Sequence, residues 1–361
     1  MEKKTILAVV LSAVIIMGYQ FYITKYYPAP VGTNANTTTA INETLPQLPA
    51  GESVGKIAEP AASETEISNL PEKIINIDTN KYAVTLSSIG GCIKSIQLKE
   101  HVTSMATNGF SLINITDPQD GIFNMDSLGA YRISGANFSC EQKEGEVIFT
   151  ANIGGKIEVI KKYIFHNSSY IIDLEVYIKN VTDRQLMAGY FINTGSHIGV
   201  DSPIDKRYIQ AVAEIGGKVK RNGGGKRDGL FIKGNVSYAG LQNRYFSVIA
   251  KTDLPTEGLL VKRLADENVS SAIKVIDFAI LPRAMVSQKF ELYAGPTDKN
   301  TMGQYGLVGA ANYGFLGGVS DILLAGLKLF HKIFKNWGIA IILLSILVNM
   351  ILFPLSRKSY E

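Results

Sequence analysis

The stretch Ile-Asp-Leu-Glu-Val-Tyr-Ile-Lys, residues 172–179, decides the fold, because apolar and polar side chains alternate along its whole length. Successive side chains of a β-strand point to opposite faces, so the stretch predicts a strand with one buried and one solvated face. Similar runs lie at residues 82–86, 146–153, 156–165, 245–250 and 272–279. Turn residues separate them, at Gly90-Gly91, Gly154-Gly155, Asn167-Ser168-Ser169 and Gly223-Gly224-Gly225. Many strands with short turns predict an all-β antiparallel sandwich over residues 74–312.

The N-terminal segment, residues 1–27, has the pattern of a transmembrane anchor. Ile6 to Thr24 is a run of 19 residues without a charge. At ~1.5 Å of rise per residue, a helix of this length covers roughly the 30 Å hydrocarbon core of a bilayer. Lys3 and Lys4 precede the run and predict a cytoplasmic N-terminus. The alternative is a cleaved signal peptide, whose apolar region is usually shorter.

Residues 28–73 differ in composition from the segments on either side. They contain no Phe, Tyr or Trp, and Pro, Thr, Asn, Ser, Ala and Glu dominate. Such a chain buries too little apolar surface to offset the entropy lost on ordering. We therefore expect a disordered linker between the anchor and the β-domain.

Residues 318–335 predict an amphipathic helix. One stripe of it is polar and mostly basic, and consists of Asp321, Lys328, His331, Lys332 and Lys335. The remaining positions are largely apolar, a pattern typical of a helix that lies in a membrane–water interface. The alternative is an ordinary helix packed on the β-domain.

A second apolar run, residues 337–355, follows directly. It contains 19 residues without a charge and starts with the only tryptophan of the chain, Trp337. Arg357 and Lys358 then mark residues 356–361 as a cytoplasmic end. Two spans with both termini in the cytoplasm place the β-domain outside it.

The composition excludes several classes of function. A net charge of +4 without a long basic run gives no sign of nucleic-acid binding. Two cysteines, Cys92 and Cys140, are too few for a disulfide-dense scaffold or a four-cysteine zinc site, and they leave open one disulfide or two free thiols. The four histidines lack metal-ligand spacing, and Gly223–Arg227 lacks the remaining residues of a phosphate loop. We expect no catalytic, cofactor or metal site.

Ser345 and Asn349 form the one polar feature inside the second apolar run. They are four residues apart and so share a face of a helix. A carboxamide facing lipid costs free energy, so this face should meet other protein or a wet cavity. The alternatives are a substrate groove and simple contact between helices.

Several stretches, taken in chain order, carry a resemblance to a known family. They are Ser-Ile-Gly-Gly-Cys-Ile at 88–93, Gln-Asn-Arg-Tyr-Phe at 242–246, Tyr-Ala-Gly-Pro at 293–296, Asn-Trp-Gly at 336–338 and Phe-Pro-Leu-Ser at 353–356. In this order, over about 330 residues, the chain resembles the YidC family of bacterial membrane protein insertases.

The resemblance implies a fold, a function and a set of partners. The fold is a periplasmic β-supersandwich, like galactose mutarotases, whose concave face could bind an extended peptide or a sugar chain. The function is that of an insertase and chaperone of the inner membrane, not an enzyme. It helps nascent membrane proteins to insert and fold. The partners are these proteins and the lipid bilayer, with Sec translocon components and the ribosome possible.

Two departures from the family qualify this expectation. The family core has five transmembrane helices after the periplasmic domain, whereas this sequence contains one, which predicts a truncated insertase. The family usually carries Arg where this chain has Asn349, so the groove here offers hydrogen bonds instead of a positive charge. The alternative function is a two-span periplasmic scaffold, or a peptide- or sugar-binding module, without insertase activity.

Overall fold

The computed structural model describes residues 71–101, 109–200, 202–223, 229–264, 268–311 and 317–360. The predicted N-terminal anchor lies outside the described residues, as do nearly all of the linker and two glycines of the 223–225 turn. The side chains of Asp321, Leu352 and residues 354–360 are also outside them.

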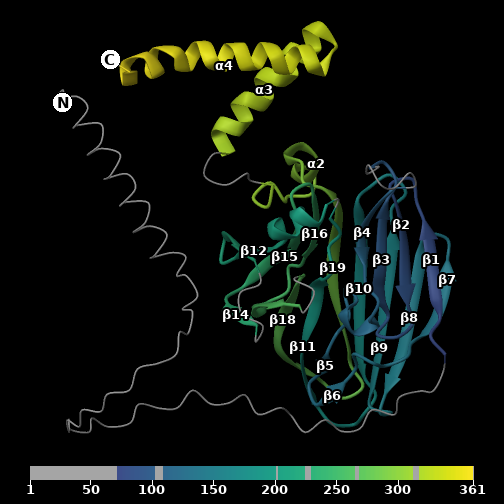
Figure 1. Ribbon diagram of the computed structural model, residues 1–361. Helices are drawn as coiled ribbons and strands as arrows, with labels where there is room; N and C mark the ends of the chain where they lie inside the picture. The colour runs from purple at the N-terminus through teal and green to yellow at the C-terminus, as the bar shows by residue number, and fades with distance from the viewer. Residues whose placement is uncertain are drawn as a thin grey trace, which may run out of the picture. The chain divides into compact units, whose positions relative to one another are not determined.

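A nine-stranded antiparallel sheet is the centre of the β-domain (Figure 1). Its strands, in spatial order, are β13 (Lys218–Asn222), β12 (Gln210–Ile215), β15 (Val236–Gln242), β16 (Phe246–Lys251), β19 (Met285–Pro296), β10 (Ile171–Asn180), β9 (Ile157–Phe165), β8 (Glu146–Ile153) and β7 (Ser139–Lys143). The alternating stretch 172–179 forms most of β10, between β9 and β19. Its apolar residues are buried and its polar ones are half-buried or exposed, as the alternation predicts.

Two four-stranded sheets pack against this central sheet. One consists of β1 (Ile74–Asp78), β2 (Tyr82–Ser87), β3 (Cys92–Leu98) and β4 (Phe110–Asn114). The other has the order β11 (Leu186–Gly195), β18 (Val269–Ile280), β17 (Thr256–Arg263) and β14 (Leu230–Lys233). The Tyr163 hydroxyl of β9 donates to Gly91 O at 2.7 Å and so ties the first sheet to the central one. The second sheet contacts the central one at β15 and β16.

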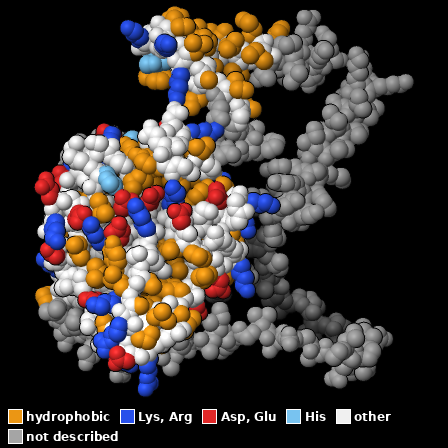
Figure 2. Space-filling model, turned by 180° about the vertical axis from the view of Figure 1, so that it is seen from behind, with side chains coloured by type: hydrophobic (Ala, Val, Ile, Leu, Met, Phe, Trp, Pro, Cys, Tyr) orange, Lys and Arg blue, Asp and Glu red, His pale blue; other side chains and the backbone are white. Residues whose placement is uncertain are grey.

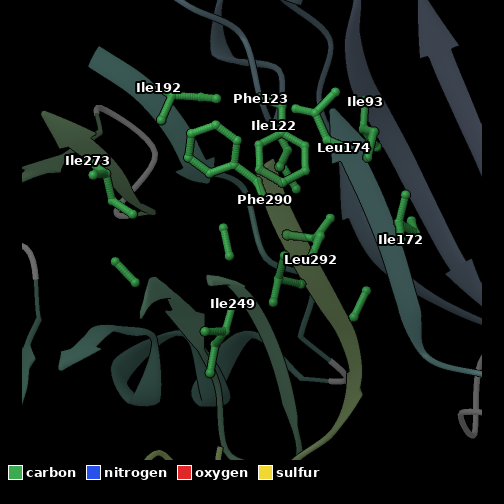
Figure 3. Packing of buried hydrophobic residues seen from close by; sticks show 14 of the residues in the cluster. Ile93, Ile122, Phe123, Ile172, Leu174, Ile192, Ile249, Ile273, Phe290 and Leu292 are labelled. Atoms are coloured by element: carbon green, nitrogen blue, oxygen red, sulfur yellow. The ribbon is translucent and has the colours of Figure 1, made fainter. Parts of the chain in front are cut away.

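One continuous core runs through all three sheets. Figure 3 shows Ile93 of the first sheet, Leu174 of the central sheet and Ile192 of the second sheet around the same aromatic pair. That pair is Phe123 and Phe290, whose ring centroids are 5.9 Å apart. The predicted all-β sandwich is therefore confirmed, and the β-domain has one core shared by its three sheets.

The predicted strands agree closely with the observed ones. The predicted strand 146–153 is β8 from end to end, and 156–165 exceeds β9 by one residue. The six predicted runs correspond to β2, β8, β9, β10, β16 and β18. The sequence did not predict the other strands individually, β11 and β19 among them. It also did not predict two short 3₁₀ turns, Pro118–Asp120 and Pro203–Tyr208, or the small hairpin of β5 (Ser127–Leu128) and β6 (Tyr131–Arg132).

Three helices follow β19. They are α2 (Lys299–Gly303), α3 (Gly317–Phe334) and α4 (Trp337–Tyr360). Counting only the parts of the helices that are fully described, none is long and apolar enough to cross a membrane.

Candidate functional site

The pair of helices α3 and α4 is joined by a two-residue turn. Lys335 takes a left-handed backbone conformation, φ 51°, and donates its N–H to His331 O at 2.7 Å. Asn336 then caps α4, because its Oδ1 accepts from Gly338 N at 2.8 Å and from Ile339 N at 3.3 Å. The Trp337 ring stacks on His331 with centroids 3.7 Å apart. The Asn-Trp-Gly stretch thus fixes how α4 starts against α3.

The two predicted groove residues, Ser345 and Asn349, lie one above the other on α4. Both are exposed, and the Asn349 carboxamide donates to Ser345 O at 3.0 Å. Around them the exposed side chains of α4 are apolar: Ile341, Ile342, Ile346, Leu347, Met350 and Ile351. Figure 2 shows hydrophobic side chains over much of the visible surface of the helix pair, with lysine and histidine gathered toward one end. The structure therefore brings Ser345 and Asn349 together as an isolated polar spot.

A cleft of about 770 Å³ opens on the β-domain. Its floor is formed by β11, β17 and β18, and its wall by the loop after β4. Charged side chains line it at Asp120, Asp126, Arg132 and Lys262, beside apolar Phe191 and Leu260. This volume is within the ~300–1,000 Å³ usual for ligand sites.

Asn124 holds the wall of this cleft in place. Its buried Nδ2 donates to three backbone carbonyls, Pro118 O at 3.1 Å, Gln119 O at 3.0 Å and Ser134 O at 3.2 Å. The Asp126 carboxylate accepts from Phe191 N at 2.9 Å and so ties the same loop to β11. The wall is therefore held by these side-chain hydrogen bonds together with short backbone bridges, such as Met125 to Ile192 of β11, and not by a continuous sheet ladder.

Lys161 connects this wall to the first sheet. Its side chain is 1% exposed, and its Nζ donates to Gly90 O at 2.7 Å and to Phe123 O at 2.8 Å. Burial lowers the pKa of this amine to about 8, while the nearby thiol of Cys92 acts in the opposite direction. Lys161 thus stabilises two carbonyls from separate segments.

The sequence prediction missed both Lys161 and the cleft. Lys161 could have been found, because it occupies an inward position of the run 157–165, between the buried Val159 and Tyr163. The cleft could not, since its wall has no periodic pattern.

A second hollow, of about 670 Å³, lies over β10, β16 and β19. In it the ring of His166 lies 2.8 Å from the Asp173 carboxylate, and Lys251 lies 3.5 Å from Glu291. The Lys251–Glu291 contact is a partly exposed ion pair, which contributes little to stability.

The two cysteines are free thiols, so the disulfide alternative is not the one observed. Cys92 is buried, and burial raises its pKa to about 12. Cys140 lies on the edge strand β7. Within the described ranges, no three His, Cys, Asp or Glu side chains are grouped so that they could hold a metal ion.

Comparison with known proteins finds similarity along the whole chain. A family profile described as YidC periplasmic domain matches residues 74–325. The membrane protein insertase YidC of Syntrophus aciditrophicus is 28% identical over 388 residues, covering 100% of this chain and 71% of that protein. The protein of the same name from Treponema denticola is 25% identical over 417 residues, covering 100% of this chain and 69% of that protein.

Two solved structures have a similar fold. A galactose mutarotase related enzyme from Lactobacillus acidophilus aligns with a TM-score of 0.47 and 12% identity, over 62% of this chain and 97% of that one. A galactose mutarotase-like protein from Lactobacillus casei aligns with a TM-score of 0.44 and 10% identity, over 62% of this chain and 100% of that one. These likenesses assign no ligand or activity to this chain.

Proposed function

This chain belongs to the YidC family of membrane protein insertases, and on that premise we propose that it assists insertion through the polar spot of Ser345 and Asn349. The observation that carries the proposal is the match of the whole chain to insertases, which extends beyond the β-domain into α4. The family is one of the inner membrane with a periplasmic domain, and its substrates are membrane proteins.

The proposed arrangement has two spans. Residues 1–27 form the N-terminal anchor, α3 lies in the interface, and residues 337–355 of α4 cross the bilayer. The uncharged length of each span supports this arrangement, as does the basic end that flanks each of them. Residues 28–73 link the anchor to the β-domain, which lies in the periplasm.

The proposed mechanism is physical and forms no covalent bond. A polar group at membrane depth lowers the cost of carrying a hydrophilic stretch of substrate partway across, while the apolar stretch moves into lipid. Asn349 has both a donor and an acceptor for this purpose, and it carries no charge. The polar spot therefore should not favour acidic substrate segments, as a positively charged Arg at position 349 would.

The partners follow from the same proposal. Nascent membrane proteins are the substrates, and Sec translocon components and the ribosome are the candidates for delivering them. The cleft on the β-domain is a candidate site for an extended peptide or a sugar chain, with the charged side chains Asp120, Asp126, Arg132 and Lys262 in its lining.

Crosslinking from position 349 tests the function. A photo-crosslinking amino acid in place of Asn349 should capture a small nascent membrane protein during its synthesis in cells. The matched control replaces Leu347, which lies at similar depth but ~180° around the helix from the polar face. We expect at least several-fold more product from position 349. Equal or absent products at both positions, from a chain that reaches the membrane, would instead support the scaffold alternative.

The topology gives a second expected result. Protease added to the outside of spheroplasts should digest or release the β-domain, while tags at both termini stay intact, because basic residues flank both spans on the same side. Immunoblots of the two tags and of the β-domain measure this. Loss of either terminal tag before the membrane is opened would contradict the two-span arrangement.

A further inference from the structure

A patch of arginine and tyrosine side chains stands out on the β-domain. It consists of Ile204, Arg207, Tyr208, Arg244 and Tyr245, and we call it the Arg–Tyr patch. The two tyrosines and the isoleucine are unusually exposed for their type, at 39% for Tyr208, 52% for Tyr245 and 66% for Ile204. Neither the cleft nor the polar spot on α4 includes any of these residues.

The cations and rings of the patch hold one another in place. The Arg244 guanidinium lies 5.3 Å from the ring centroid of Tyr208 and 5.6 Å from that of Tyr245. Arg207 lies 4.9 Å from the Tyr208 centroid. Asp205 approaches Arg244 at 3.9 Å, too long for a close ion pair, and its side chain is only 16% exposed. The patch therefore presents two positive groups among aromatic rings, with one partly covered carboxylate.

The patch is tied to the segment that leads to α3. The N–H of Thr297 donates to Tyr245 O at 2.7 Å. Gln242, at the end of β15 two residues before Arg244, donates to Ala310 O at 3.1 Å. Ala311 is buried, and α2 lies at this end of the domain (Figure 1).

The short segment between the β-domain and α3 limits how far this end of the domain can lie from that helix. Only residues 312–316 separate the buried Ala311 from Gly317, the first residue of α3. Six steps of at most ~3.6 Å span roughly 20 Å. An α3 that lies in the interface therefore keeps Ala311, and with it this end of the β-domain, within roughly 20 Å of the membrane surface.

We propose that the Arg–Tyr patch docks on the phosphate headgroups of anionic lipids in the leaflet that carries α3. Guanidinium groups bind phosphate through paired hydrogen bonds, tyrosine rings favour the depth of the headgroups, and Ile204 can enter the acyl boundary. The docking holds the β-domain in one orientation over the bilayer. This inference rests on the proposed function, because it takes α3 to lie at the membrane.

Hydrogen exchange of the full chain in nanodiscs tests the proposal. Peptides covering 203–208 and 243–246 should exchange about tenfold more slowly in discs of phosphatidylglycerol than in discs of phosphatidylcholine. Each basic group near an anionic surface shifts the docking equilibrium by roughly fivefold, so Arg207→Gln with Arg244→Gln should remove nearly all of this difference.

The matched control is Arg184→Gln with Arg283→Gln. It makes the same change of charge at exposed arginines beyond the opposite end of the β10–β19 pair, where Lys179 faces Met285. This control should keep the lipid-dependent protection. Equal exchange in the two lipids for the unmodified chain would overturn the proposal, as would loss of protection in both double variants. Protection of the patch that is the same in both lipids would show contact with the bilayer that does not depend on anionic headgroups, and would likewise overturn the proposal.

The same experiment separates this inference from the proposed function. Peptides of α3 report whether that helix meets lipid, and peptides of β10 report whether the β-domain is folded. A protected α3 with an unprotected patch would overturn only the docking, whereas an unprotected α3 would overturn the membrane arrangement itself.

Discussion

Lys161→Ala is expected to lower the free energy of unfolding of the β-domain by about 3–5 kcal/mol, because it opens a cavity and leaves two buried carbonyls without their donor. Those carbonyls belong to Gly90 and Phe123. Lys161→Met fills the same space and loses only the hydrogen bonds, so it should cost about 2 kcal/mol. Urea unfolding of the full chain in detergent, followed by circular dichroism of the β-structure, measures the loss. The fluorescence of Trp337, the only tryptophan, reports on the helices separately.

The control for this experiment is the next residue along the strand. Lys162 is on the other face of β9, where it pairs with Glu146 at 2.9 Å, and Lys162→Ala should change stability little. A Lys161→Ala variant as stable as Lys162→Ala would contradict the role given to the buried amine.

The pH dependence gives a second readout for the same amine. Burial lowers the pKa of Lys161 to about 8, so between pH 8 and 9 the unfolded chain holds a proton that the folded chain has lost. Unfolding free energy therefore rises with pH in this window, by up to ~1.4 kcal/mol per pH unit. Above pH 9 Cys92 acts in the opposite direction, because its pKa is raised to about 12. Lys161→Met should lack the rise.

Asn180→Asp should destabilise the β-domain by about 3–5 kcal/mol at pH 7, although it changes the shape of the side chain hardly at all. The buried Asn180 Nδ2 donates to Arg184 O at 2.7 Å, and to Ile280 O and Leu281 O at 3.1 Å each. A carboxylate has no donor for these three carbonyls and brings a negative charge against them. The same urea unfolding measures the effect.

The matched control is Asn114→Asp, at an exposed position of β4. It should leave the unfolding midpoint nearly unchanged. Because the carboxyl at position 180 is buried among acceptors, its pKa should be raised, and the destabilisation should diminish as the pH falls and the group gains a proton. An Asn180→Asp variant that unfolds like the control at pH 7 would show that the three carbonyls do not need the amide.

The sequence predicted six of the described strands well, because burial on one face imposes a period of two on each of them separately. Residues 172–179 are the clearest case, and β8 was bounded correctly at both ends. The other strands, β11 and β19 among them, were not predicted individually. The pairing of strands could not be predicted in this way, because the residues of β10 carry no pattern that identifies β19, more than a hundred residues away, as its partner.

The site was harder to predict than the fold, for a related physical reason. The wall of the cleft depends on single side chains such as Asn124 and on Phe123, which takes a left-handed conformation at φ 65° without being glycine. Such contacts leave no periodic pattern. The polar face of Ser345 and Asn349 could be predicted because a carboxamide interrupts an apolar run. Its role in a substrate groove stays a prediction.

The position of β19 has a consequence for how the domain is assembled. It is the last of the described strands along the chain, yet it lies in the interior of the nine-stranded sheet, between β10 and β16. A chain delivered across a membrane from its N-terminal side exposes the open edge of β10 until residues 285–296 arrive. Long-range pairing of this kind is slow, and open edges invite wrong partners. Since α3 starts 21 residues after Pro296, closure of the sheet should nearly coincide with arrival of α3 at the membrane.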